Sequence, residues 1–383
     1  MDQRMVSILF ALLRSAIRGM PMSEEERDAC SPELLRDVLG IATKHDVAHL
    51  LAVGLKQNGL VSGGIDAYIL KAVYRHERTQ CECDQLCSTL ENAGIPFLPL
   101  KGAVLRGYYP EAWMRTSCDI DVLVRRDDLD RAVACLTETL NYEEKGRETH
   151  DVSLFSPMGI HVELHFDLVE EGRANGAIDV LRSVWDNVSL HEPQQYWYDM
   201  SDAFFYFYHI AHMAKHFECG GCGIRPFIDL WILDGMENAD RAARDALLAK
   251  GGLLQFANAS RALSGVWFGG AEEDALSQQL QDFLLHGGSY GSADNRVALQ
   301  QRNKGGRIGY MLSRIFIPYH KLRRYYPILE KHKWLMPVMQ VRRWFMLLNP
   351  DIARMAKKEI QTNRSLDQQK ATDMQSLLDR MGL

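Results

Sequence analysis

The chain has 383 residues, of which 46% are hydrophobic and 25% are charged. These fractions are ordinary for a globular protein and exclude general disorder, and the length suffices for two domains. The formal net charge of −6 argues against a protein that coats nucleic acid by overall charge, although it leaves room for a local basic cleft.

No stretch approaches the roughly 18–20 apolar residues that a membrane span requires, so the sequence predicts no membrane partner. The apolar run at residues 6–13 is closely followed by Arg14 and Arg18, which favours a packed first helix over a secretion signal. The eight cysteines indicate reduced thiols in a cytoplasmic protein rather than a disulfide framework. A zinc site at Cys219 and Cys222 stays open as the weaker alternative.

The first 94 residues predict a helical region. Apolar residues recur there at helical spacing, and Gly94 is a good terminator for the last helix. Residues 95–100 are a short apolar run with two prolines, which cannot continue a helix. A helical turn follows at residues 103–105.

A compact α/β core is predicted over residues 95–175. Within it we expect a strand at 120–124, a helix at 128–140, and two strands at 152–155 and 160–166 that are joined by a turn. Residues 176–383 predict a C-terminal helical domain, with a glycine-rich loop at 284–295 and a peripheral helix over the last thirty residues. The fold class is therefore α+β, with a small mixed sheet between two helical regions.

Two carboxylates define the candidate site. Asp119 and Asp121 stand at the head of the strand at 120–124, and alternate residues of a strand point to the same face. No Lys or Arg lies beside them in the sequence, so they are expected to raise each other's pKa. A divalent cation between them would remove this repulsion. For an isolated Asp-x-Asp pattern, however, a solvated strand edge is the more common explanation.

A third acid strengthens the metal hypothesis. Glu163 lies in a strand whose residues 161, 163 and 165 share one face, while the intervening residues are apolar. If this strand and the Asp-x-Asp strand are neighbours, three acids could hold two metal ions and clamp both oxygens of a phosphoryl displacement. Lys101-Gly102 precedes these strands, and its backbone N–H groups and ammonium group could contact a phosphate.

The combined motifs resemble the uncharacterised bacterial nucleotidyltransferase family, which is similar to the DNA polymerase beta-like superfamily. The resemblance is strongest over residues 95–235, on segments that stand in this order: Leu100-Lys101-Gly102, Tyr109-Pro110, Arg115, Asp119-Ile120-Asp121, Val162-Glu163-Leu164-His165, 209–216, Arg225 and Asp229-Leu230-Trp231. It implies a nucleotidyltransferase core that binds a nucleoside triphosphate with Mg²⁺ or Mn²⁺.

The resemblance also implies roles for individual residues. Asp119, Asp121 and Glu163 would be both the metal ligands and the catalytic acids, and Gly102 would contact the triphosphate with help from Lys101. One position departs from the superfamily pattern. Its usual Gly-Ser pair is Gly102-Ala103 here, so the hydroxyl that would touch a phosphate is missing and catalytic activity is in doubt.

A histidine-rich helix supplies secondary candidates. His209, His212 and His216 fall on one helix face, with Lys215 beside them. Three interpretations stay open: a zinc site, satisfied core histidines, and a face that contacts the nucleotide, which the family resemblance favours for His212, Lys215 and His216.

Several arginines have both a functional and a structural interpretation. Arg115 could contact a phosphate or pair with an acid on the sheet, and Arg225 with Asp229 fits an i, i+4 helical pair. Two arginines are followed by two aromatic residues at 323–326 and again at 342–345. Such clusters can bind nucleic acid, but more often they are solvated charges beside a packed face.

The sequence therefore predicts a metal-dependent transfer of a nucleoside monophosphate from a triphosphate to an acceptor, with release of pyrophosphate. We expect a small molecule or a protein as acceptor rather than nucleic acid. The alternative is a catalytically weak or inactive nucleotide-binding module on the same fold, which the missing serine supports.

Overall fold

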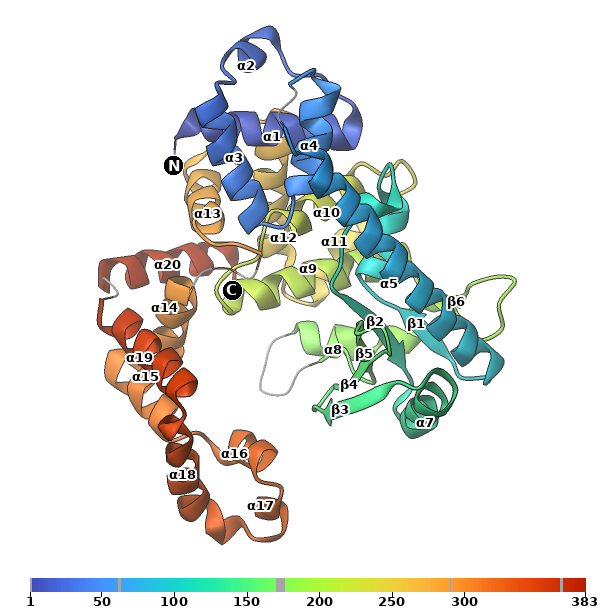
Figure 1. The fold of residues 1–383 in the computed structure, drawn as a ribbon, viewed down its shortest axis with the longest axis vertical. Helices are drawn as coiled ribbons and strands as arrows, with labels where there is room; N and C mark the ends of the chain where they lie inside the picture. The colour runs from blue at the N-terminus through green and yellow to red at the C-terminus, as the bar shows by residue number, and fades with distance from the viewer. Residues whose placement is uncertain (1, 61–62, 170–175, 290, 292, 366–367) are drawn as a thin grey trace.

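The computed structural model describes residues 2–60, 63–169, 176–289, 291, 293–365 and 368–383. The N-terminal part is helical, as predicted, and leads into the sheet region (Figure 1). Its helices are α1 (Gln3–Arg18), α2 (Glu24–Asp28), α3 (Pro32–Lys44), α4 (Ala48–Gln57) and α5 (Asp66–Asn92). The helix α1 is amphipathic, and its apolar face is buried, which confirms the expected packed first helix.

A five-stranded mixed sheet follows. Its strands lie in the order β1-β2-β5-β4-β3, in which β2 and β5 are parallel and the other neighbours are antiparallel. The bounds are β1 (Phe97–Pro99), β2 (Asp119–Val124), β3 (Glu143–Arg147), β4 (Asp151–Phe155) and β5 (His161–His165), with α6 (Gly102–Leu105) after β1 and α7 (Leu129–Leu140) after β2. The strand β3 was not expected, because all five of its residues are exposed and carry no apolar alternation.

The C-terminal half is mainly helical, and the predicted α+β class is confirmed. It contains α8 (Ala177–Arg182), α9 (Asp202–Glu218), α10 (Arg225–Asp234), α11 (Arg241–Lys250), α12 (Leu254–Ser264) and α13 (Ala275–Leu285). A small second sheet of β6 (Val188–Leu190) and β7 (Tyr198–Met200) lies before α9 and was missed, because each strand has only three residues.

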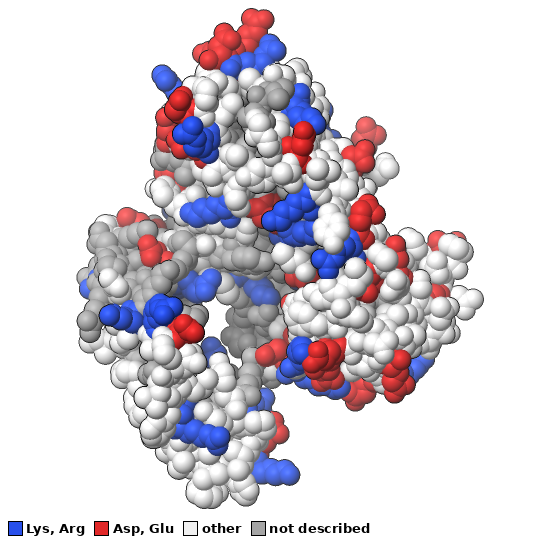
Figure 2. Space-filling model, in the orientation of Figure 1, with Lys and Arg blue, Asp and Glu red and all other residues white. Residues whose placement is uncertain are grey.

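The last helices are α14 (Ala293–Asn303), α15 (Gly306–Ile315), α16 (Tyr319–Tyr325), α17 (Ile328–Lys331), α18 (Met336–Trp344), α19 (Pro350–Ser365) and α20 (Gln368–Met381). Of these, α15 to α19 form an arm that extends away from the sheet (Figure 1). The expected glycine-rich loop is shorter than predicted, since helices end at 285 and resume at 293; Tyr290 and Ser292 lie outside the described residues. On the face shown in Figure 2, charged side chains on the lower part of the arm are mainly basic.

Two hydrophobic cores position the sheet. The first lies between one sheet face and the helices α5 and α7, and it includes Ile120, Val122, Val162 and Leu164. The second joins the N-terminal helices to the C-terminal helices. The helix α20 contributes to this second core through Leu377, so the prediction of a merely peripheral C-terminal helix was wrong. No helix in the described part of the chain has the length and apolar composition needed to cross a bilayer.

Candidate active site

The acidic residues lie on the sheet face opposite the core under α5 and α7. Because Ile120 and Val122 face the core under α5 and α7, the alternate residues Asp119 and Asp121 face the other side. The parallel pairing of β2 with β5 places Asp121 directly beside Glu163. The strand Asp119–Val124 is therefore a neighbour of the strand that holds Glu163, which is the arrangement that the metal hypothesis requires.

Two basic side chains contact the same oxygen of Asp121. Lys101 Nζ lies 3.2 Å from Asp121 Oδ1, and His165 Nε2 lies 3.0 Å from it. Burial alone would raise the pKa of Asp121, but Lys101 and His165 outweigh burial and hold that pKa well below its ordinary value. The expectation that no cation stands beside the acids was wrong, because Lys101 is distant in sequence and reaches Asp121 only through the packing of β1 against β2.

Asp119 has the opposite electrostatic environment. Burial and the neighbouring charge of Asp121 raise the pKa of Asp119. The predicted increase in pKa is therefore confirmed for Asp119 and wrong for Asp121. The cause is that Lys101 and His165 contact Asp121 directly.

Asp121, Glu163 and His165 fit a divalent-cation site. Their ligand atoms all lie within 4.8 Å of one another. In the described part of the chain, this is the one group of three His, Cys, Asp or Glu side chains placed closely enough to hold a metal ion. His165 Nε2 also lies 3.3 Å from Glu163 Oε2, so this one nitrogen contacts both carboxylates. In the described part of the chain, the cysteine pair and the histidines of α9 are not members of this group.

The Lys101-Gly102 turn is bent towards the acids. Lys101 has a φ of 42° and a ψ of −108°, a conformation that residues with a Cβ rarely adopt. Such strain persists where surrounding contacts enforce it and often marks a functional segment. A Cβ added at Gly102 would lie only 3.2 Å from Cβ of Ser117. The side chain of Ser117 therefore lies beside Gly102, and both residues line a cleft that also contains the acids. Ser117 carries a hydroxyl there, whereas Ala103 has none.

The helix α9 forms the opposite wall of this cleft, which has a volume of about 250 Å³. His212 and His216 line it together with Lys215, and their Nε2 atoms lie 3.2 Å apart. Burial lowers the pKa of His212 well below its ordinary value, and the charge of Lys101 adds to this effect. His209 also lines the cleft but hydrogen-bonds the carbonyl oxygen of Pro226 at 3.0 Å.

Arg115 is held by an acid from outside the sheet. Its Nε donates to Asp229 Oδ1 at 2.7 Å, and both side chains are buried. Tyr109 donates its hydroxyl hydrogen to the same oxygen at 2.7 Å. Asp229 therefore binds Arg115, whereas the sequence suggested Arg225, four residues earlier in α10, as its helical partner. Arg225 instead contacts Asp46 Oδ2 at 3.2 Å.

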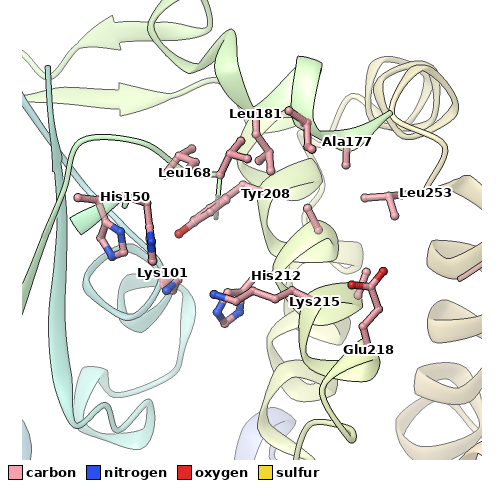
Figure 3. Close-up of a pocket in the computed structure, with 15 residues that line it drawn as sticks. Lys101, His150, Leu168, Ala177, Leu181, Tyr208, His212, Lys215, Glu218 and Leu253 are labelled. Atoms are coloured by element: carbon pink, nitrogen blue, oxygen red, sulfur yellow. The ribbon is translucent and has the colours of Figure 1, made fainter. Parts of the chain in front are cut away.

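A smaller pocket with a volume of about 70 Å³ shares Tyr208 and His212 with the lining of the cleft. Figure 3 shows the Tyr208 ring in the centre of this pocket and the side chains of Lys215 and Glu218 at one side. Its wall is largely apolar, and the lining includes Leu168, Val169, Ala177, Ile178, Leu181, Ala211, Ala214 and Leu253.

Sequence reasoning did not single out His165, Tyr208 or Ser117 as site residues. The signal for His165 was available, because it stands two positions after Glu163 and must share its strand face. Ser117 carried no such signal. It stands in an irregular segment before β2, and its approach to Gly102 arises from tertiary packing.

A family described as uncharacterised nucleotidyltransferases matches residues 32–269 of the chain. The chain belongs to this nucleotidyltransferase family. No curated protein and no solved structure matches it at a significant level. The match spans the acidic strands, the Lys101-Gly102 turn and both cleft helices α9 and α10, so the nucleotidyltransferase family covers every element that lines the acidic face of the cleft.

Proposed function

We propose that this nucleotidyltransferase binds a nucleoside triphosphate with Mg²⁺ or Mn²⁺ and transfers the nucleoside monophosphate to an acceptor hydroxyl. The observation that carries the proposal is the pairing of Asp121 with Glu163 on adjacent parallel strands, with Asp119 on the same sheet face. Three acids on two neighbouring strands are also what the DNA polymerase beta-like superfamily would place there. A bound divalent cation would neutralise the polyphosphate and the developing charge on the leaving group.

The two walls of the cleft would bind different parts of the substrate complex. Asp121 and Glu163 would hold the cation, with Asp119 as a further carboxylate on the same side. Lys215, Arg225, His212 and His216 line the same cleft. The cationic groups of Lys215 and Arg225 would contact the phosphates. Gly102 would allow close backbone approach, and Ser117 would offer the hydroxyl that Ala103 lacks.

The reaction itself would need mainly positioning and charge neutralisation, as other phosphoryl transfers do. The acceptor oxygen would form a bond to the α-phosphorus while the bond to pyrophosphate breaks. Glu163 would accept the proton of the acceptor hydroxyl. The apolar pocket beside Tyr208 supports an acceptor with a compact apolar group, such as a small molecule or a protein side chain.

The most direct test removes the negative charge of Asp121. Asp121→Asn should abolish Mg²⁺-dependent binding of a nucleoside triphosphate, measured by calorimetry, and Glu163→Gln should weaken it strongly. Asp199→Asn is a matched control, because Asp199 also contacts a histidine, His191, but lies on β7 in the second sheet. Unchanged Mg²⁺-dependent affinity in Asp121→Asn would refute the proposed site.

The structure also supports a second candidate, a nucleotide-binding module with little or no turnover. Its specific basis is that Lys101 and His165 already neutralise Asp121, together with the missing hydroxyl at Ala103. Incubation with labelled triphosphates, Mg²⁺ and cell extract separates the candidates. Transfer of label with release of pyrophosphate identifies the enzyme, whereas tight binding without release identifies the module.

A further inference from the structure

The arm at residues 306–348, which we call the C-terminal arm, differs in charge from the rest of the chain. It carries nine Lys and Arg residues and a single acidic residue, Glu330, although the whole chain has a net charge of −6. It also lies outside residues 32–269, which the family match covers. Its role can therefore be separate from the chemistry of the cleft.

The C-terminal arm also exposes an unusual amount of apolar surface. Of the eighteen large apolar side chains that are exposed in the described part of the chain, twelve lie between residues 308 and 348. They include Trp334 at 73% exposure and Leu348 at 79%. The tip of the arm buries only a small core of Leu322, Leu329 and Met339, which is too small to cover these side chains.

The exposed residues form stripes on two helices. On α15, Ile308, Leu312 and Ile315 follow one another at spacings of four and three and are 77%, 50% and 41% exposed, so they share one helix face. Tyr310, in contrast, is buried. The stripe is therefore the outward apolar face of an amphipathic helix, and α18 repeats the pattern.

The stripe of α18 continues into the turn that follows it. Val338, Val341 and Phe345 are 55%, 46% and 65% exposed at spacings of three and four. The two helices are joined at their C-terminal ends, because Trp344 Nε1 donates to the carbonyl oxygen of Ile315 at 3.0 Å. The two apolar stripes therefore belong to one structural unit, and cations lie beside them.

The charge and the chemistry of these side chains indicate which kind of partner the C-terminal arm binds. A second copy of the arm would bring two strongly basic surfaces together, which is unfavourable. Nucleic acid would satisfy the cations, but only one of the six stripe residues, Phe345, is aromatic, so the stripes offer little surface for base stacking. Helices with Lys and Arg on the polar face and Trp, Phe and Leu on the other are typical of binding in the interface of a bilayer that contains anionic lipid.

We infer that the C-terminal arm docks on the surface of a membrane that contains anionic lipids. The apolar stripes of α15 and α18 enter the boundary between head groups and acyl chains, and the basic side chains contact the lipid phosphates. This departs from the sequence expectation of no membrane partner, which rested on the lack of a spanning segment. An arm that lies on a bilayer needs no such segment.

The test uses the full chain and vesicle flotation. The protein should float with vesicles that mix phosphatidylglycerol and phosphatidylcholine, and should not float with phosphatidylcholine alone. Replacing four stripe residues, Ile308, Leu312, Val338 and Phe345, by Asn should lower the partition coefficient about tenfold or more. The matched control is Leu70→Asn with Met158→Asn, since these side chains are 68% and 52% exposed on other elements.

A second variant tests the cations. Lys321→Gln with Lys331→Gln should lower vesicle binding about 25-fold at low salt, because each cation near an anionic surface contributes about fivefold. All substituted side chains are exposed, so circular dichroism should show unchanged folding. The inference is overturned if the protein does not float with anionic vesicles, or if the stripe variant floats as well as the wild type. Stripe-dependent binding to RNA or DNA, or stripe-dependent dimers in light scattering, without vesicle binding, overturns it as well.

Discussion

Lys101 Nζ and Asp121 Oδ1 lie 3.2 Å apart, so the lysine of the Lys-Gly turn is bound to the central acid of the cleft. Burial alone would lower the pKa of Lys101, but the carboxylates of Asp121 and Glu163 help to outweigh burial and raise it. Lys101 is therefore charged at neutral pH and competes with any cation for Asp121. If a cation displaced Lys101 from Asp121, this ammonium group would become available to a phosphate oxygen.

This competition gives the first prediction. Lys101→Met should raise the affinity for Mn²⁺ in the absence of nucleotide about tenfold, because a charge-assisted bond to Asp121 no longer has to be broken. The same variant should weaken triphosphate binding. Isothermal calorimetry measures both quantities. Lys215→Met is the matched control, since Lys215 lines the same cleft; an equal gain in Mn²⁺ affinity in both variants would argue against a specific competition at Asp121.

The second prediction concerns the missing hydroxyl. Ser117→Ala should weaken triphosphate binding about fivefold, the effect expected for loss of one hydrogen bond. Ala103→Ser in the same background should restore part of the affinity. Ser183→Ala serves as the control, because the Ser183 hydroxyl donates to the Val180 carbonyl oxygen away from the cleft. Equal affinities in Ser117→Ala and wild type would show that Ser117 does not contact the nucleotide.

The buried Arg115–Asp229 pair gives the third prediction, on stability. Arg115→Met should cost about 3–5 kcal/mol of unfolding free energy, because it leaves the Asp229 carboxylate buried without its cation. Arg147→Met removes two exposed ion pairs, with Asp130 and Glu144, and should cost less than about 1 kcal/mol. Urea unfolding measures both.

A double variant separates charge from packing at this position. Arg115→Met with Asp229→Asn should recover more than half of the loss, since the uncharged amide can still accept the Tyr109 hydroxyl hydrogen. If the double variant is as unstable as Arg115→Met alone, the loss came from packing of the arginine and not from the unpaired charge.

The fourth prediction is a dependence of stability on pH. Burial lowers the pKa of His45 to about 4 in the folded protein, from an ordinary value of about 6.5. Between these values the unfolded chain binds more protons at His45 than the folded protein does, so stability falls as the pH falls. The contribution is complete above about pH 6.5, and about 2 kcal/mol of it should be lost by about pH 5.

Urea unfolding at neutral and acidic pH checks this prediction. His45→Leu should flatten the loss of stability between the two pH values, whatever its effect at neutral pH. His332→Gln, at an exposed position of the arm, should keep the wild-type dependence. An unchanged slope in His45→Leu would mean that the acid sensitivity comes from other groups.

Some of the site could be read from local sequence. The alternation of acidic and apolar residues in β2 and β5 predicts which side chains share a face, because a strand points successive side chains to opposite sides. The helices of the first 93 residues were predictable for the same kind of reason, from helical spacing and from Gly94. In contrast, β3, β6 and β7 were missed, because short or exposed strands carry no apolar pattern.

The amino-acid sequence by itself determined that Asp119 and Asp121 lie on one strand face and that Glu163 lies on another, since these relations depend only on neighbours along the chain. Only the tertiary structure decided that Asp121 stands beside Glu163, that Lys101 binds Asp121, and that Arg115 binds Asp229. Each of these contacts joins segments that are far apart in sequence. The local patterns allow many strand registers and many contacts between helices. One of these arrangements is selected by the packing of the sheet against α5 and α7 and of α10 against the N-terminal helices.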